Sequence, residues 1–224
     1  MRLWKIESDR ISRRDSQVRV IGITGGVGAG KSRILQILQE EYHARILLAD
    51  EVAAELEEPG KEGYRLLVER FGKGILKDDK RLDRSAFAEL IFKDERALHD
   101  VNAIIHPLTW QVLCERVEEL AGQAGENGIL IAVEAALFDG QSRRLCDALW
   151  FIDTSEENRI RRLIESRGYT REKCQSIIHN QPCREDFLAL ADSVIDNNGT
   201  IAEVREQIAR LLGPDGKNPL PVKK

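Results

Sequence analysis

The segment Gly25–Ser32, which reads Gly-Gly-Val-Gly-Ala-Gly-Lys-Ser, is the feature that most constrains this chain. It fits the phosphate-binding pattern G-x-x-x-x-G-K-[ST]. Residues 18–24 before it are rich in β-branched side chains and predict a buried strand. An amphipathic helix is predicted after it, from the helical spacing of Ile34, Leu35, Ile37 and Leu38. A strand, a glycine loop and a helix in this order predict an α/β fold whose loop binds a nucleoside triphosphate.

The residue types in this loop indicate how it would hold phosphate. Glycines let the backbone curl so that successive N–H groups point at phosphate oxygens, and the following helix presents its positive end to the same anion. Lys31 is expected to reach the β- and γ-phosphates, and the Ser32 hydroxyl to bind Mg²⁺. The alternative is an ordinary glycine-rich turn before a helix. The four glycines, the lysine and the serine all stand in place, and this disfavours that alternative.

Length and charge limit the remaining function classes. The 224 residues suit one large domain or a core with inserted pieces, and the net charge of −4 gives no reason to expect a nucleic-acid partner. No apolar run is long enough for a bilayer, so no membrane partner is expected. Residues 1–17 lack the apolar core of a secretory signal and are interpreted as an N-terminal extension. Reduced thiols in the cytoplasm, rather than zinc or disulfides, are expected from the wide spacing of Cys114, Cys146, Cys174 and Cys183.

Two acidic residues follow predicted core strands. A strand over about residues 44–48 leads to Asp50, and another over residues 129–133 is followed by Glu134. Ligands of α/β proteins bind at the carboxyl ends of such strands. Asp50 is therefore a candidate for acid–base chemistry, the alternative being an N-cap of the next helix. Glu134 is a candidate for holding hydrated Mg²⁺, the alternative being a capping or solvent-facing glutamate.

The block of residues 51–106 predicts helices and no convincing strand. Inserted between two strands of a parallel sheet, it is typical of an acceptor-substrate pocket. Within it, Asp83 is expected to cap one helix, and another is expected from about residue 94 to 105. A new helix is predicted to open at Pro107, because proline suits a first turn. His106 would then lie at the positive end of that helix, with either a functional or a purely structural role.

The last third predicts a lid and the end of the sheet. After a strand at residues 149–152, the segment from Thr154 to Glu157 fits a capping box. The helix that follows is rich in arginine and leads through a Gly-Tyr break into a second helix. Such a pair can close over a triphosphate and stabilise the transferring phosphoryl group, or it can be a solvated basic face. A final strand at residues 191–196 precedes a tight turn and a closing amphipathic helix.

Taken together, stretches between Val18 and Leu212 resemble the dephospho-coenzyme A kinase family. Thr24–Ser32 matches the family's Thr-Gly-Gly-x-Gly-x-Gly-Lys-Ser loop. The other stretches that match the family in order are Ala49-Asp50, Glu58-Pro59-Gly60, Phe71-Gly72, Ile75-Leu76, Leu82-Asp83-Arg84, Ile91-Phe92, Asn102, His106-Pro107, Arg184-Glu185 and Ala191–Gly199. The loop alone indicates only a nucleotide, whereas this combination at fitting spacing is specific.

The resemblance implies ATP-dependent phosphorylation of the ribose 3′-hydroxyl of dephospho-coenzyme A, the last step of coenzyme A synthesis, with Mg²⁺. The implied fold is an α/β, three-layer P-loop kinase with a parallel sheet, a helical substrate-binding insertion and a helical lid. The predicted parts are an extension at 1–17, a nucleotide-binding core at 18–50, 107–160 and 190–213, an acceptor domain at 51–106, a lid at 161–189 and a tail at 214–224. The protein is expected to be a monomer or a weak homo-oligomer.

Site residues follow from the resemblance position by position. The ATP-binding residues it implies are Gly26, Gly28, Ala29, Gly30, Lys31, Ser32, Arg33 and Asn197, the last expected near the adenine. The catalytic residues it implies are Asp50 as general base, Lys31, and Arg162 on the lid helix. Asp50, Arg84 and His106 are predicted to bind the acceptor.

The chain also departs from the family pattern. Leu48 replaces the first aspartate of the D-A-D segment, so Asp50 alone remains for acid–base work there. Arg33 stands where threonine is usual, residues 134–139 differ from the familiar P-L-L-F-E, and Ser166 occupies the place of a second lid arginine. One alternative function is another small-molecule kinase that acts on a nucleoside or a sugar. A nucleotide-dependent switch is disfavoured because no N-K-x-D base-reading motif is present.

Overall fold

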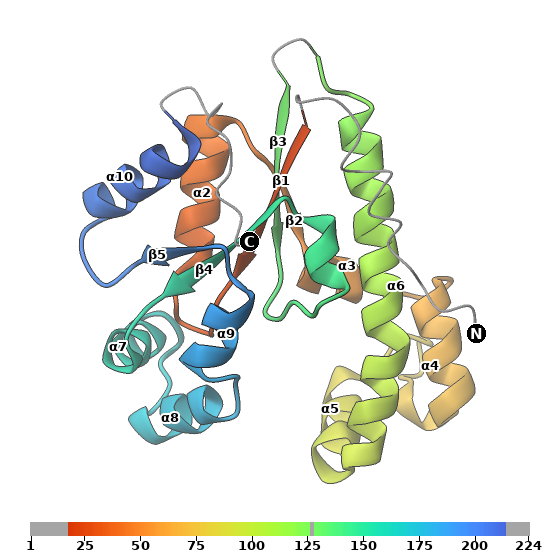
Figure 1. Ribbon diagram of the computed structural model, residues 1–224. Helices are drawn as coiled ribbons and strands as arrows, with labels where there is room; N and C mark the ends of the chain where they lie inside the picture. The colour runs from red at the N-terminus through yellow and green to blue at the C-terminus, as the bar shows by residue number, and fades with distance from the viewer. Residues whose placement is uncertain (1–17, 126–127, 214–224) are drawn as a thin grey trace. The chain divides into compact units, whose positions relative to one another are not determined.

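The computed structural model describes residues 18–125 and 128–213 (Figure 1). The predicted extension at 1–17 and the tail at 214–224 lie outside these residues. The described chain divides into two compact units. The first unit holds residues 48–116, and the second holds residues 18–47 and 117–213.

The second unit is built on a five-stranded parallel sheet, as the sequence predicts. The strand order across the sheet is β2 (Arg45–Leu48), β3 (Ile129–Glu134), β1 (Val18–Thr24), β4 (Ala148–Asp153) and β5 (Ser193–Asp196). β1 lies at the centre and pairs in parallel with both β3 and β4. Because parallel strands end at one edge, the loop after β1 emerges in the middle of the edge where such folds bind ligands.

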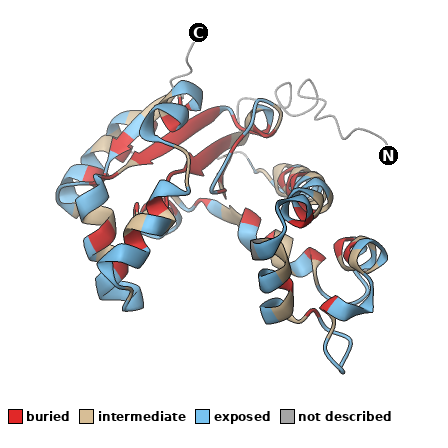
Figure 2. Cartoon of the chain, turned by 90° about the horizontal axis from the view of Figure 1, so that it is seen from below, coloured by how far each residue is buried: buried red, intermediate tan, exposed pale blue. Residues whose placement is uncertain are grey.

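Two helices pack side by side in this unit. α2 (Lys31–Tyr42) buries Ile34, Leu35, Ile37 and Leu38, the face that the sequence predicts. α10 (Ile201–Leu212) buries Val204, Ile208 and Leu212. An ion pair of 2.6 Å between Arg205 and Glu41 joins the two helices, which lie next to each other in Figure 1. β1, β3 and β4 are buried along most of their length, whereas the outer faces of the helices are exposed (Figure 2).

Three short helices and their connections follow β4 and contain residues 161–189, for which the sequence predicts a lid; they are called the lid region below. α7 (Glu156–Arg167) and α8 (Arg171–His179) pack through Ile160, Leu163, Cys174 and Ile178. α9 (Arg184–Leu190) is a helix that the sequence analysis missed. Its Phe187 is buried and stacks on Phe151 of β4, with ring centroids 5.0 Å apart. The predicted cap of α7 is wrong by one residue, because Ser155 rather than Thr154 accepts the bond from a first-turn N–H.

The first unit is helical. It contains α3 (Ala49–Leu56), α4 (Glu62–Phe71), the 3₁₀ turn η1 (Lys73–Ile75), α5 (Arg84–Lys93) and most of α6 (Glu95–Ala121). Leu67, Phe87, Val101 and Ile105 are among the residues of its core. Asp83 caps α5 by accepting bonds from two first-turn N–H groups, as predicted. None of the helices in the described ranges has the length and apolar character needed to cross a bilayer.

The predicted helix start at Pro107 is wrong. α6 runs without interruption from Glu95 to Ala121, so Pro107 lies in its interior. A proline there removes one backbone hydrogen bond and costs about 3 kcal/mol. Burial of Val101 and Ile105 before the proline, and of Leu113 and Val117 after it, continues one apolar face across the site and outweighs this cost. His106 is consequently an exposed mid-helix residue, not a residue at a positive helix end.

Candidate functional site: the phosphate loop and its supports

The loop between β1 and α2 has the curled backbone that its glycines predict. Gly28 and Gly30 have φ angles of 76° and 89°, which L side chains rarely adopt. The Ala29 N–H donates to the Gly26 carbonyl at 3.1 Å, which closes the turn. α2 begins at Lys31, directly after the turn, so its first N–H groups lie at the loop.

The Ala29 carbonyl anchors this loop to three other segments. It accepts hydrogen bonds from Thr154 Oγ1 at 2.9 Å, Arg162 Nη1 at 3.1 Å and Asn197 Nδ2 at 2.7 Å. Ala29 is only 1% exposed, and Arg162 also donates to the Asn197 carbonyl at 2.7 Å. Arg162, predicted as a catalytic residue of the lid helix, and Asn197, predicted to bind ATP, therefore hold the loop backbone. Burial lowers the pKa of Arg162 from its usual value.

Replacing Gly30 by alanine is expected to disrupt this anchor. A Cβ at position 30 would lie 2.4 Å from Asn197 Nδ2, and the positive φ strains any L residue. We expect the free energy of unfolding to fall by about 1–3 kcal/mol and ATP affinity to fall with it. Thermal unfolding and ATP titration measure both quantities. Gly74→Ala is the matched control, because nothing lies within 4 Å of a Cβ there, and an unchanged Gly30→Ala protein would contradict this account.

A second set of contacts joins the loop to the lid region. Arg159 donates to the Val27 carbonyl at 2.8 Å and to Gln181 Oε1 at 2.6 Å. Gln181 Oε1 also accepts from the Val27 N–H at 2.9 Å, so the three residues form a closed ring. The burial of Arg159 lowers the pKa of its guanidinium group. A Cβ at Gly26 would lie 2.2 Å from Arg159 Nη2, so a larger residue there would displace this guanidinium group.

Lys31 and Glu134 face each other beside the loop. Lys31 Nζ donates to the Gly25 carbonyl at 2.7 Å and lies 3.4 Å from Glu134 Oε1. Their side chains are only 16% and 14% exposed, so the solvent-facing alternative for Glu134 is wrong. Ser32 and Arg33 are exposed at the start of α2. In the part of the chain that the structure describes, no three His, Cys, Asp or Glu side chains form a metal-binding group.

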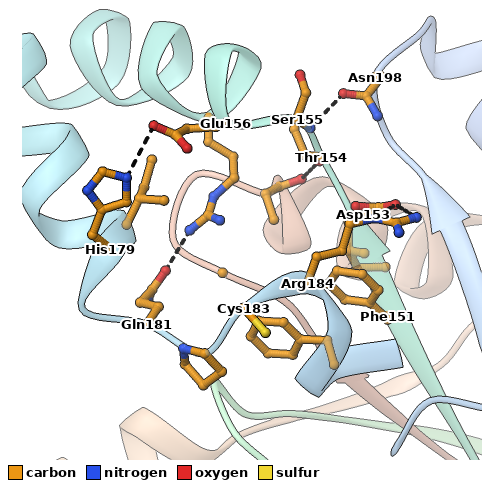
Figure 3. A pocket seen from close by; sticks show the side chains of 17 residues that line it. Phe151, Asp153, Thr154, Ser155, Glu156, His179, Gln181, Cys183, Arg184 and Asn198 are labelled. Atoms are coloured by element: carbon orange, nitrogen blue, oxygen red, sulfur yellow. Dashed lines mark hydrogen bonds and ion pairs between the residues drawn. The ribbon is translucent and has the colours of Figure 1, made fainter. Parts of the chain in front are cut away.

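A cavity of about 540 Å³ lies between the loop and the lid region (Figure 3). Gly26 and Ala29 line one side, and residues of the segment from β4 to α9, together with Asn198, line the rest. Arg184 donates to Asp153 Oδ2 at 2.8 Å across one wall. At another wall, the dashed line that ends on Gln181 in Figure 3 marks the hydrogen bond that its Oε1 accepts from Arg159 Nη2. The volume falls in the range of sites for small organic ligands, and the lining is rich in charged and polar groups.

In the first unit, the structure corrects one prediction and brings two motif stretches together. Leu48 is the N-cap of α3, so the alternative role of Asp50 as N-cap is wrong; Asp50 is the second residue of the helix and is exposed.

Arg84 begins α5, and its Nη2 lies 3.8 Å from Glu57 Oε2. Burial raises the pKa of Glu57, and the charge of Arg84 partly offsets this effect. Both residues and Pro59 line a cavity of about 490 Å³, which His106 does not line.

The comparisons with known proteins show the family of this chain. The family model described as dephospho-CoA kinase matches residues 19–203. The dephospho-CoA kinase of Ralstonia nicotianae is 38% identical over 200 residues, which cover 87% of this chain and 97% of that protein. That of Carboxydothermus hydrogenoformans is 34% identical over 193 residues, which cover 86% and 92% of the two chains.

Solved structures share the fold. TT1252 from Thermus thermophilus aligns with a TM-score of 0.70 and 26% identity over 87% of this chain and 95% of its own. A dephospho-CoA kinase from Campylobacter jejuni aligns with a TM-score of 0.64 and 20% identity over 89% and 98% of the two chains. The matched range contains the phosphate loop, both arginines that hold it, and Asn197. This chain belongs to the dephospho-CoA kinase family of P-loop phosphotransferases.

Proposed function

We propose that this protein transfers the γ-phosphoryl group of ATP to the ribose 3′-hydroxyl of dephospho-coenzyme A, giving coenzyme A and ADP. The observation that carries the proposal is the phosphate loop, with Lys31 placed beside it and its backbone held by three segments. Membership of the family supports the choice of acceptor. The alternative, a kinase of the same fold with a nucleoside or sugar acceptor, shares the loop and differs in the acceptor alone.

The proposed mechanism is an in-line transfer. The loop N–H groups and the first turn of α2 bind the β- and γ-phosphates, and Lys31 neutralises charge on them. The acceptor oxygen forms a bond to the γ-phosphorus as the bond from that phosphorus to the bridging oxygen breaks, and ADP leaves. Asp50 accepts the hydroxyl proton. Asp50 is the second residue of the helix after β2, a strand of the same sheet, so the chain order is consistent with this role.

The residues beside the loop fit a divalent cation of the hard type. Mg²⁺ prefers oxygen ligands and is commonly bound through one or two protein oxygens together with substrate phosphates. Ser32 offers a hydroxyl at the start of α2, and Glu134 offers a carboxylate near Lys31. When bound, the cation would neutralise charge on the phosphates of ATP. We therefore propose Ser32 as a ligand and Glu134 as a second, water-mediated one.

Arg84 is proposed to bind a phosphate group of the acceptor from the cavity in the first unit. Its side chain is 68% exposed, and its planar guanidinium group can donate two parallel hydrogen bonds to phosphate oxygens. We expect Arg84→Ala to raise the KM for dephospho-coenzyme A about ten-fold while kcat and the KM for ATP change little. Arg65→Ala is the matched control, because Arg65 is also an exposed arginine in this unit, on α4. An equal effect of both substitutions would contradict the assignment.

The function is tested by ADP release with Mg-ATP and a panel of acceptors. Release that requires dephospho-coenzyme A supports the proposal, whereas release with only a nucleoside or sugar would replace it with the alternative.

We also propose that the protein acts in the cytoplasm, as a monomer or a weak homo-oligomer. Sedimentation that showed a tight oligomer at low micromolar concentration would contradict the proposed oligomeric state.

A further inference from the structure

A small apolar pocket of about 260 Å³ lies in the second unit, where β1 ends. Its lining includes Thr24, Leu137, Phe138, Leu149, Phe187 and Leu190. Leu137 and Leu190 are large apolar residues, yet they are 51% and 39% exposed. Such residues at the rim of a pocket mark a surface that a ligand can cover.

The walls of this pocket are fixed by tight packing. Phe138 and Leu149 close over Gly22, where an added Cβ would lie 2.7 Å from Leu149 Cδ1 and 3.1 Å from Phe138 Cζ. Phe187 is held by its stacking on Phe151, with 6° between the ring planes. The pocket is therefore preformed, and Leu137, Leu190 and the charged Asp186 are the exposed residues at its rim.

The position and the size of the pocket select its occupant. Thr24 is the last residue of β1 and is followed directly by the phosphate loop, so the pocket adjoins the loop. At about 260 Å³ it is smaller than the roughly 300–1,000 Å³ of pockets that enclose drug-sized ligands, so it suits one flat ring system and not a whole coenzyme. In the proposed reaction the attacking hydroxyl belongs to the ribose that carries the acceptor's adenine. That base must lie one sugar away from the transferred phosphoryl group, whereas a pyrophosphate separates the pantetheine arm from it.

We propose that this pocket binds the adenine base of the acceptor, dephospho-coenzyme A. The inference rests on the proposed function and adds to it the subsite that positions the 3′-hydroxyl. Phe138, Leu149 and Phe187 enclose the ring, and Leu137 and Leu190 cover its edge. Apolar and aromatic surfaces of this kind bind a nucleobase through its face.

Serine substitutions at the rim test the proposal by steady-state kinetics. We expect Leu137→Ser and Leu190→Ser each to raise the KM for dephospho-coenzyme A about ten-fold, with the KM for ATP changed less than about two-fold. Val194→Ser on β5 is the matched control, because Val194 is 40% exposed and does not line the pocket. Unchanged KM values for dephospho-coenzyme A in both rim variants would overturn the proposal. An equal rise in both KM values would also overturn it.

Competition by the two halves of the acceptor identifies which part the pocket holds. The double rim variant carries both Leu137→Ser and Leu190→Ser. With the ATP site filled by a non-hydrolysable ATP analogue, we expect this variant to bind 5′-AMP about a hundred-fold more weakly than the wild type does. We expect both proteins to bind 4′-phosphopantetheine equally well. The opposite pattern would assign the pocket to the pantetheine arm and overturn the proposal. A wild-type enzyme that shows no release of ADP dependent on dephospho-coenzyme A would refute the proposed function, and the adenine subsite with it. Active wild type with unaffected rim variants would refute the subsite alone.

Discussion

Replacing Lys31 by alanine is expected to lower kcat at least about 10²-fold. Lys31 lies beside the loop, where it would neutralise charge that develops on the transferred phosphoryl group. Loss of one preorganised charge-stabilising donor typically costs 10²–10³ in rate. The measurement is acceptor-dependent ADP release at saturating concentrations of both substrates. Lys73→Ala, an exposed lysine in η1, should retain the wild-type rate.

The same substitution also removes a cation that lies 3.4 Å from Glu134 Oε1. Loss of a cation beside a carboxylate that is only 14% exposed destabilises the fold, and a loss of activity through unfolding has to be separated from a loss of chemistry. Glu134→Gln combined with Lys31→Ala removes the carboxylate charge as well as the ammonium charge. We expect the double variant to regain thermal stability but to turn over far more slowly than Glu134→Gln alone. Turnover equal to that of Glu134→Gln alone would show that Lys31 acts through folding alone.

Asp50→Asn is expected to lower kcat about 10²-fold or more, with little change in either KM. General-base catalysis contributes typically 10²–10⁴ in rate, and an amide cannot accept the hydroxyl proton. The readout is again ADP release, together with the pH dependence of kcat in the wild type. Turnover close to that of the wild type would show that the base assignment is wrong.

The neighbouring residue Glu51 supplies the control for Asp50. Both carboxylates lie in the first turn of α3, both are exposed, and both favour the helix through its positive end. Glu51→Gln and Asp50→Asn should therefore reduce thermal stability to a similar, small extent. Only Asp50→Asn should reduce turnover. This comparison separates the proton acceptor from the helix-stabilising charge.

The central part of the fold follows from local sequence patterns. The bounds of β1 and the buried face of α2 agree with the prediction, because a β-branched run and an apolar helical stripe each fit one structure. The phosphate loop follows for the same reason, since its glycines meet backbone requirements that few other residues can meet. Asp83 as the cap of α5 is equally local.

The wrong predictions concern features that tertiary packing decides. At Pro107 the local rule for proline favours a helix start, but the buried face of α6 continues across it. At Thr154 the local pattern favours a cap, but the hydroxyl donates instead to Ala29, which lies 125 residues away. Gln181 carries no local signal, because its partners Val27 and Arg159 lie 154 and 22 residues from it. Such roles emerge only when the chain is folded.

The three donors on the Ala29 carbonyl have a consequence for the order in which the protein is made. The loop lies near the start of the described chain, yet its anchors are at positions 154, 162 and 197. Translation proceeds from the N-terminus, and domains fold as their residues become available. Until Asn197 has emerged from the ribosome, the nascent chain carries the complete glycine motif but lacks at least one of the three side chains that donate to the Ala29 carbonyl. The first motif to be synthesised is thus among the last parts of the molecule to become competent for binding.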